Sequence, residues 1–231
     1  MIDIRHDARM RQVFSACVTL GFAVGVYAVS FGVSAVSAGA SVAQTCVMSL
    51  LIFTGASQFS AVSVIGAGGS PLAAFGGAAV LAARNGVYGL AMASTFSGHL
   101  STRLVAAQLT IDESTAMAAA QDDPQHRRAA FWITGLSVYL FWNVGTLIGA
   151  LLGKAIDPLT FGLDAAFPAS FVALLFPLLR ERVPARAAAT GALVCLVLIP
   201  FVPVGVPILC ATVGVLFGIP DPSEPNREVA S

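Results

Sequence analysis

The chain has 231 residues, of which 57% are hydrophobic and only 10% are charged, and its mean hydropathy is +0.84. A soluble domain of this size cannot hide so much apolar area, so the composition excludes an ordinary soluble fold and predicts a membrane protein. Twelve Lys and Arg residues balance twelve Asp and Glu residues, so no net charge attracts nucleic acid. We therefore expect an all-α, polytopic bundle of transmembrane helices.

The first apolar run covers 13–37 and follows Arg5, Arg9 and Arg11. It is longer than the apolar region of a cleaved signal peptide, about 7–15 residues, so we expect it to be an uncleaved first helix. A span needs about 20 mainly apolar residues. Four further stretches qualify or nearly qualify, and these are 42–66, 71–97, 129–152 and 165–180. Prolines 200, 203 and 207 divide the last apolar stretch into two expected short helices, 187–201 and 205–219.

The stretch 104–121 contains Asp112 and Glu113, and it can be read as a surface helix or as a further span. If it crosses the membrane, nine arginines fall on one side and only Arg103 and Lys154 on the other. Because cytoplasmic loops carry the excess of Lys and Arg, we expect it to cross, which gives seven to eight spans with some short or broken helices. Both termini would be cytoplasmic. Short or re-entrant segments would give the same charge pattern.

No soluble domain is predicted. We expect one transmembrane domain over 1–220 and a disordered polar tail over 221–231. Glycines recur at four-residue spacing, as at 21 and 25, at 145, 149 and 153, and at 214 and 218. Small residues let membrane helices approach closely, so these are expected packing seams, within the chain or with a second subunit. The four cysteines lie in apolar runs without metal-ligand spacing, and we expect neither a metal site nor a cofactor.

Arg84 lies in the middle of the span 71–97, next to Asn85 and one turn before Tyr88. A centrally placed arginine costs at least ~2.5 kcal/mol in a membrane, so it needs a partner or a watery cavity. One interpretation is a structural ion pair that joins two helices. The other is a substrate site, because a guanidinium can hold a carboxylate through two hydrogen bonds.

Thr54, Ser57 and Gln58 share one face of the span 42–66, and Gly55 can loosen the helix between them. Unwound backbone at membrane depth normally lines a cavity, so these side chains are candidate substrate ligands. The alternative is that Thr54 and Ser57 donate to their own helix, which leaves Gln58 unexplained.

Asp112 and Glu113 are candidates for proton coupling or for pairing with Arg84, because buried carboxylates readily take up protons. Their alternative is an interfacial position on a surface helix. Asp164 is an additional candidate site residue, although it would cap a helix in any case. Trp132 and Trp142 are expected to pack or to anchor the helices at the interface. The chain lacks HExxH and GxSxG motifs, and we do not expect an enzyme.

The sequence resembles the AzlC-type branched-chain amino acid permeases from about residue 14 to residue 182. The resemblance rests on four segments, which are MSLLIFTGASQF at 48–59, RNGVYGL at 84–90, DES at 112–114 and GLDAAFP at 162–168. The chain departs from the usual pattern of the family at Ala82, where Asn is common, and at Asn85, where His or Tyr is common. These departures bear on the exact substrate.

The resemblance implies a secondary transporter that exports branched-chain amino acids across a bacterial cytoplasmic membrane, together with a small hydrophobic AzlD-type subunit. We expect a central cavity in which Thr54, Ser57, Gln58, Arg84, Asn85 and Tyr88 bind the substrate. Arg84 would hold the carboxylate, and Asp112 or Glu113 would hold the amino group or a coupling proton. A membrane scaffold without transport activity and a small-solute channel are the alternatives.

Overall fold

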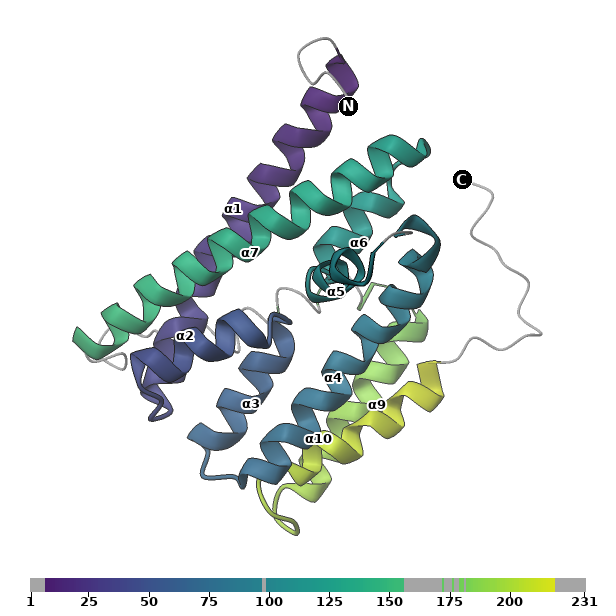
Figure 1. Cartoon of the computed structure of the whole chain (residues 1–231). Helices are drawn as coiled ribbons and strands as arrows, with labels where there is room; N and C mark the ends of the chain where they lie inside the picture. The colour runs from purple at the N-terminus through teal and green to yellow at the C-terminus, as the bar shows by residue number, and fades with distance from the viewer. Residues whose placement is uncertain are drawn as a thin grey trace.

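The computed structural model describes residues 7–96, 99–155 and 182–218, with Val172, Phe176, Leu179 and Arg180 between the last two ranges. Throughout these residues the elements are helices, so the predicted all-α class is confirmed (Figure 1). The α-helices are α1 (Ala8–Ser37), α2 (Val42–Leu51), α3 (Ala56–Gly66), α4 (Pro71–Met92), α5 (Leu100–Gln108), α6 (Asp112–Ala119), α7 (Pro124–Ala155), α9 (Arg182–Leu198) and α10 (Val206–Ala211), and the 3₁₀ turns are η1 (Ala93–Thr95) and η3 (Thr212–Gly218).

Helices α1 and α7 are the two longest helices described, and they pack side by side as a parallel pair (Figure 1). They have 30 and 32 residues, and both are long and apolar enough to cross a membrane. Their backbones touch at the predicted glycines: a Cβ atom on Gly145 would overlap the carbonyl oxygen of Gly25, and one on Gly149 would overlap that of Val29. The expected packing seam therefore lies within the chain.

Carboxylates begin both helices of this pair. Asp7 caps α1 by accepting from the N–H groups of Arg9 and Met10, and Asp123 accepts from the N–H groups of Gln125 and His126. The ring of His126 joins the two caps, with Nδ1 2.8 Å from Asp123 Oδ2 and Nε2 3.1 Å from Asp7 Oδ2. We call the side of the molecule where α1 and α7 begin the N-face.

The predicted span 42–66 is divided into two helices, and the break includes Gly55, where the sequence predicted that the helix loosens. Helix α2 ends at Leu51 and α3 begins at Ala56, because Gly55 adopts φ +52° and ψ −86°. The Cβ position of Gly66, at the end of α3, lies 3.1 Å from Ala38, just after the end of α1. That of Gly55 lies 3.5 Å from Trp142, about halfway along α7. The α2–α3 hairpin thus enters from the face opposite the N-face, reaches mid-depth and returns.

A continuous helix over 104–121 is also absent. The residues 109–111 separate α5 from α6, which have nine and eight residues and are about 12–14 Å long, too short to span a bilayer. The α5–α6 hairpin follows Phe96, which packs on Phe131 with ring centroids 4.3 Å apart. The hairpin ends where the carbonyl of Gln121 accepts from the Arg127 side chain. Both contacts lie in the first turns of α7, so the α5–α6 hairpin enters from the N-face.

The α2–α3 and α5–α6 hairpins each return to the face from which they enter. The predicted distribution of Lys and Arg between the two faces is therefore almost unchanged. Arg9, Arg127 and Arg128 still lie on the N-face, and Lys154 still lies at the far end of α7. Arg103 now joins the arginines of the N-face, because the α5–α6 hairpin begins and ends there. The charge pattern that favoured a crossing is therefore also produced by two opposed re-entrant hairpins.

The expected C-terminal pair of short helices is confirmed, as α9 and as α10 with η3. Their proline-rich turn lies against the start of α4, where the Cβ position of Gly205 is 2.7 Å from Ala73. The expected span 165–180, Asp164 and the tail 221–231 lie outside the described residues, apart from single residues within that span.

The surface of this bundle is strongly apolar. Leu72 and Leu90 on α4 are each 79% exposed, and Phe201 is 78% exposed. The buried core contains Phe31, Phe59, Phe131 and Trp142. Large aliphatic and aromatic side chains in such numbers on the outside fit a hydrocarbon surrounding and not water. The chain is thus built as a helical membrane protein.

Candidate functional site

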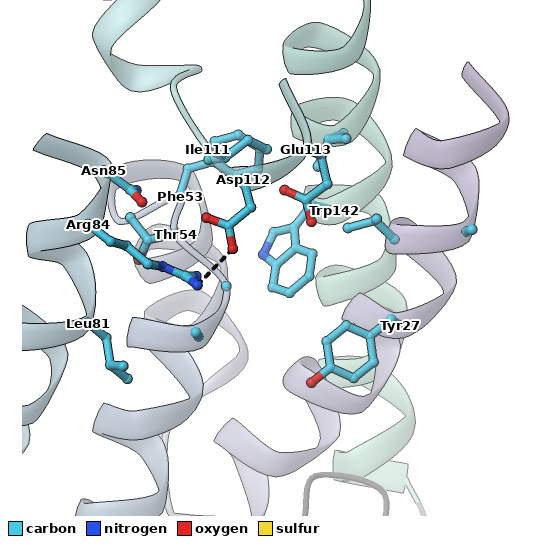
Figure 2. A pocket seen from close by; sticks show the side chains of 15 residues that line it. Tyr27, Phe53, Thr54, Leu81, Arg84, Asn85, Ile111, Asp112, Glu113 and Trp142 are labelled. Carbon is cyan, nitrogen blue, oxygen red and sulfur yellow. Dashed lines mark ion pairs between the residues drawn. The ribbon is translucent and has the colours of Figure 1, made fainter. Parts of the chain in front are cut away.

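A pocket of about 580 Å³ lies where the two hairpin tips meet the middle of α1, α4 and α7 (Figure 2). The volume is in the range of small-molecule sites. Most of its wall is apolar, and its charged groups come from α4 and from the beginning of α6. The lining residues are Ala23, Val24, Tyr27, Phe53, Thr54, Gly55, Ala56, Leu81, Arg84, Asn85, Ile111, Asp112, Glu113, Val138 and Trp142.

The tip of the α2–α3 hairpin is held open by Gln58, which is fully buried. Its Oε1 accepts from the N–H of Gly55 at 3.2 Å, and its Nε2 donates to the carbonyl of Met48 at 3.3 Å. A broken helix leaves backbone groups that need partners at membrane depth, and one amide side chain here serves both sides of the break. Gln58 therefore stabilises the hairpin tip. The sequence predicted that it lines the pocket, but it does not.

The end of α2 receives two further donors from distant parts of the chain. Gln108 Nε2 donates to the carbonyls of Leu50 at 3.2 Å and Leu51 at 3.4 Å, and the hydroxyl of Tyr139 also donates to Leu50 at 3.1 Å. These contacts tie the end of α5 and the middle of α7 to the tip of the α2–α3 hairpin. Sequence reasoning missed them, because nothing local in the chain links residues 50 and 108.

The tip of the α5–α6 hairpin is built around Ser114. Its Oγ accepts from the N–H of Ile111 at 3.1 Å and donates to the carbonyl of Leu109 at 2.6 Å. Ser114 is completely buried, so this turn is held away from water. The bonds set the start of α6 such that Asp112 and Glu113, its first two residues, line the pocket.

Arg84 and Asp112 form an ion pair across the pocket, with Nη1 2.8 Å from Oδ2 (Figure 2). Their side chains are 40% and 41% exposed, so the pair lies in an open cavity and not in the dry core. The contact joins α4 to α6. Of the two interpretations of Arg84, the ion pair is therefore the one present in this structure. The other oxygen of Asp112 is buried and has no hydrogen-bond partner among the described residues.

The other predicted site residues divide into three groups. Thr54, Asn85 and Glu113 line the pocket. Ser57 is buried in the first turn of α3 but is not part of the lining, and Tyr88 lies one turn further along α4, also outside it. Asp164 lies outside the described residues.

Two aromatic residues that line the pocket were not among the candidate site residues from the sequence. Tyr27 of α1 lines the wall, although nothing in its apolar run distinguishes it. Trp142 was expected to pack or to anchor, and its ring packs on Phe31, with centroids 6.1 Å apart; the residue also lines the pocket. Only the tertiary arrangement brings α1 and α7 to the hairpin tips. A signal that could have found Trp142 is its position halfway along a 32-residue span, far from either interface.

The pocket can hold a small zwitterion with an apolar side chain. It offers a cation, two carboxylates and a wall of aliphatic and aromatic groups within one cavity. Within the described ranges, no three His, Cys, Asp or Glu side chains cluster as a metal site would require. The arrangement is thus one for binding through charge and shape.

The chain is similar to known proteins of one family. The sequence model of one family, described as AzlC protein, matches residues 19–156 of the chain. The branched-chain amino acid transport protein AzlC of Bacillus subtilis (strain 168) is 26% identical over 182 residues, which cover 78% of this chain and 68% of that protein. No solved structure matches the chain.

Proposed function

The chain belongs to the AzlC family, and from this premise we propose that it is a secondary transporter of branched-chain amino acids in a bacterial cytoplasmic membrane. The observation that carries the proposal is the pocket at mid-depth, where two broken helices meet an Arg, an Asp and a Glu. Broken helices at the middle of a membrane normally form transporter binding sites, since their free ends can hold polar substrates. The relative from Bacillus subtilis is named for transport of the same class of amino acids.

Two further parts of the proposal are that the N-face lies in the cytoplasm and that the direction of transport is export. The orientation rests on the distribution of Lys and Arg. Arg9, Arg103, Arg127 and Arg128 gather on the N-face, whereas Lys154 lies at the opposite end of α7, and positive charge favours the cytoplasmic side. Both termini would then be cytoplasmic. Export itself follows from the resemblance to the AzlC-type permeases, as does the proposed AzlD-type partner subunit.

Glu113 is the proposed site of proton coupling. It lines the pocket and has no ion-pair partner among the described residues, unlike the neighbouring Asp112. A carboxylate in such a cavity can exchange between its charged and its protonated form as the substrate enters and leaves. Glu113→Gln should therefore retain leucine exchange across a membrane and lose leucine accumulation driven by a proton gradient.

The deciding experiment is leucine flux in proteoliposomes, with and without a co-expressed small hydrophobic membrane protein. A carrier gives saturable counterflow: unlabelled leucine inside the vesicles accelerates the entry of labelled leucine. A channel gives flux that does not saturate and shows no counterflow. Absence of leucine flux with both subunits present would contradict the transporter and favour the scaffold alternative.

A further inference from the structure

Two helix N-termini face the pocket, but only one of them is supplied with negative charge. Helix α6 begins with Asp112 and Glu113. Helix α3 has no acidic residue in its first turn, and its N-cap, Gly55, has no side chain to accept a hydrogen bond. Both Gly55 and Ala56 line the pocket. The N–H groups at the start of a helix carry partial positive charge, so the beginning of α3 can receive an anion.

A second donor belongs to the wall of the same pocket. Trp142 is 3% exposed, and its Nε1–H has no acceptor among the described residues. Cη2 on the six-membered part of its ring lies 3.5 Å from the Cβ position of Gly55, beside the beginning of α3. Figure 2 shows the indole nitrogen on the side of the ring that faces the cavity, toward Asp112. A buried N–H without an acceptor is unfavourable, and it marks a position where a polar ligand atom would be stabilised.

Ser57 is also buried without a hydrogen-bond partner among the described residues, but it does not line the pocket. It is 1% exposed, and it belongs to the first turn of α3. Arg84, in contrast, is already occupied by Asp112 at 2.8 Å. Among the buried side-chain donors that lack an acceptor in the described residues, Trp142 Nε1–H is therefore the one whose residue lines the pocket.

We propose that the first turn of α3 and the Nε1–H of Trp142 form the subsite for the substrate carboxylate. This inference rests on the proposed transport of amino acids and assigns the orientation of the substrate in the pocket. The carboxylate lies at the α3 tip, the ammonium group lies at the acidic start of α6, and the side chain lies against Val24 and Val138. Arg84 holds α4 to α6 and does not bind the carboxylate.

The test compares two ligands that differ in the carboxylate alone. Leucine and 3-methylbutylamine have the same side chain and ammonium group. Trp142→Phe keeps an aromatic ring and removes the N–H, and Trp132→Phe is the matched control, because Trp132 packs on Phe96 and Phe131 outside the pocket lining. Equilibrium binding of both ligands is measured on the purified protein. Loss of one hydrogen bond to a charged group weakens leucine binding roughly 10- to 100-fold.

The expected result is that Trp142→Phe weakens leucine by this factor and leaves the amine within about twofold of wild type. Equal loss for both ligands would show that the ring acts only through packing, and unchanged leucine binding would exclude the N–H contact; either overturns the subsite. If the wild-type protein binds no leucine, the proposed function fails and the subsite fails with it.

A second measurement serves if Trp142→Phe does not fold. The chain has two tryptophans, so in Trp132→Phe the emission comes from Trp142 alone. Saturating leucine should shift this emission, whereas saturating 3-methylbutylamine should not. The same shift with both ligands, or with neither, contradicts a carboxylate contact at Trp142.

Discussion

Replacing Arg84 and Asp112, separately and together, separates a structural ion pair from a substrate clamp. In the structure the two side chains meet at 2.8 Å and are about two-fifths exposed. Exposed pairs contribute about 0–1 kcal/mol, and loss of one partner of a buried pair costs about 3–5 kcal/mol. A pair in a half-open cavity should lie between these limits, at about 1–3 kcal/mol, discounted for the water that reaches it.

Each single alanine variant leaves one unpaired charge in the cavity, so both should lower the thermal stability of the purified protein. The double variant Arg84→Ala/Asp112→Ala removes both charges, and it should be more stable than the less stable of the two single variants. Arg103→Ala is the matched control, because Arg103 is exposed and lies outside the pocket. Thermal denaturation in detergent measures the stabilities, and leucine counterflow measures the function.

Two results would refute this reasoning. If the destabilisation of the double variant equals the sum of the two single effects, the side chains do not interact, contrary to the structure. If the double variant is folded and stable but Arg84→Ala alone accounts for all loss of leucine binding, Arg84 is the carboxylate clamp after all, and the subsite at α3 is wrong.

Three further predictions concern the frame around the pocket. Gly145→Ala should destabilise the protein by about 1–3 kcal/mol, because the added Cβ would overlap the α1 backbone. Gly86→Ala, with nothing within 4 Å of its Cβ position among the described residues, should be neutral or slightly stabilising in thermal denaturation. The backbone N–H of His126 donates to the Asp123 carboxylate and lowers its pKa, so this carboxylate stabilises the fold above about pH 4, and the stabilisation is lost as the pH falls further. Asp123→Asn should therefore make thermal stability less dependent on pH in acid, and an unchanged pH profile would contradict this role of Asp123. Gln108→Ala should cost about 1 kcal/mol, because the Leu51 carbonyl loses this donor whereas the Leu50 carbonyl keeps the Tyr139 hydroxyl. The exposed Gln125→Ala should have no such effect, and equal losses of stability in denaturation would contradict the role of Gln108.

Several features could be predicted because they depend on composition or on residues close together in the chain. The helical membrane class follows from the apolar fraction, and the turn between α9 and α10 follows from its prolines. Gly55 was correctly identified as a point where the helix loosens, since glycine in a span with nearby polar side chains is a local signal. The glycine seam of α1 and α7 follows likewise from four-residue spacing.

The path of the two hairpins could not be obtained in this way. A segment of 25 apolar residues such as 42–66 is long enough to cross, and only the contact of Gly66 with Ala38 shows that it returns. Charge counting could not correct the error, because two non-crossing segments restore the same sides. Asp112 and Glu113 begin a short helix at a hairpin tip and do not lie within a continuous span, and their position inside the membrane stays a prediction.

The sequence by itself determined which residues are costly in a membrane, and Arg84, Asp112 and Glu113 do line one pocket. It also indicated that the Gln58 side chain needs hydrogen-bond partners at its place in the span. In the structure these partners are the backbone groups on both sides of the helix break. The tertiary structure alone decided the neighbours: Asp112 is the ion-pair partner of Arg84, and the ring of Trp142 lies beside Gly55 at the beginning of α3. Burial costs belong to single residues and can be read from the chain, whereas their compensation comes from groups that only folding brings within hydrogen-bond distance.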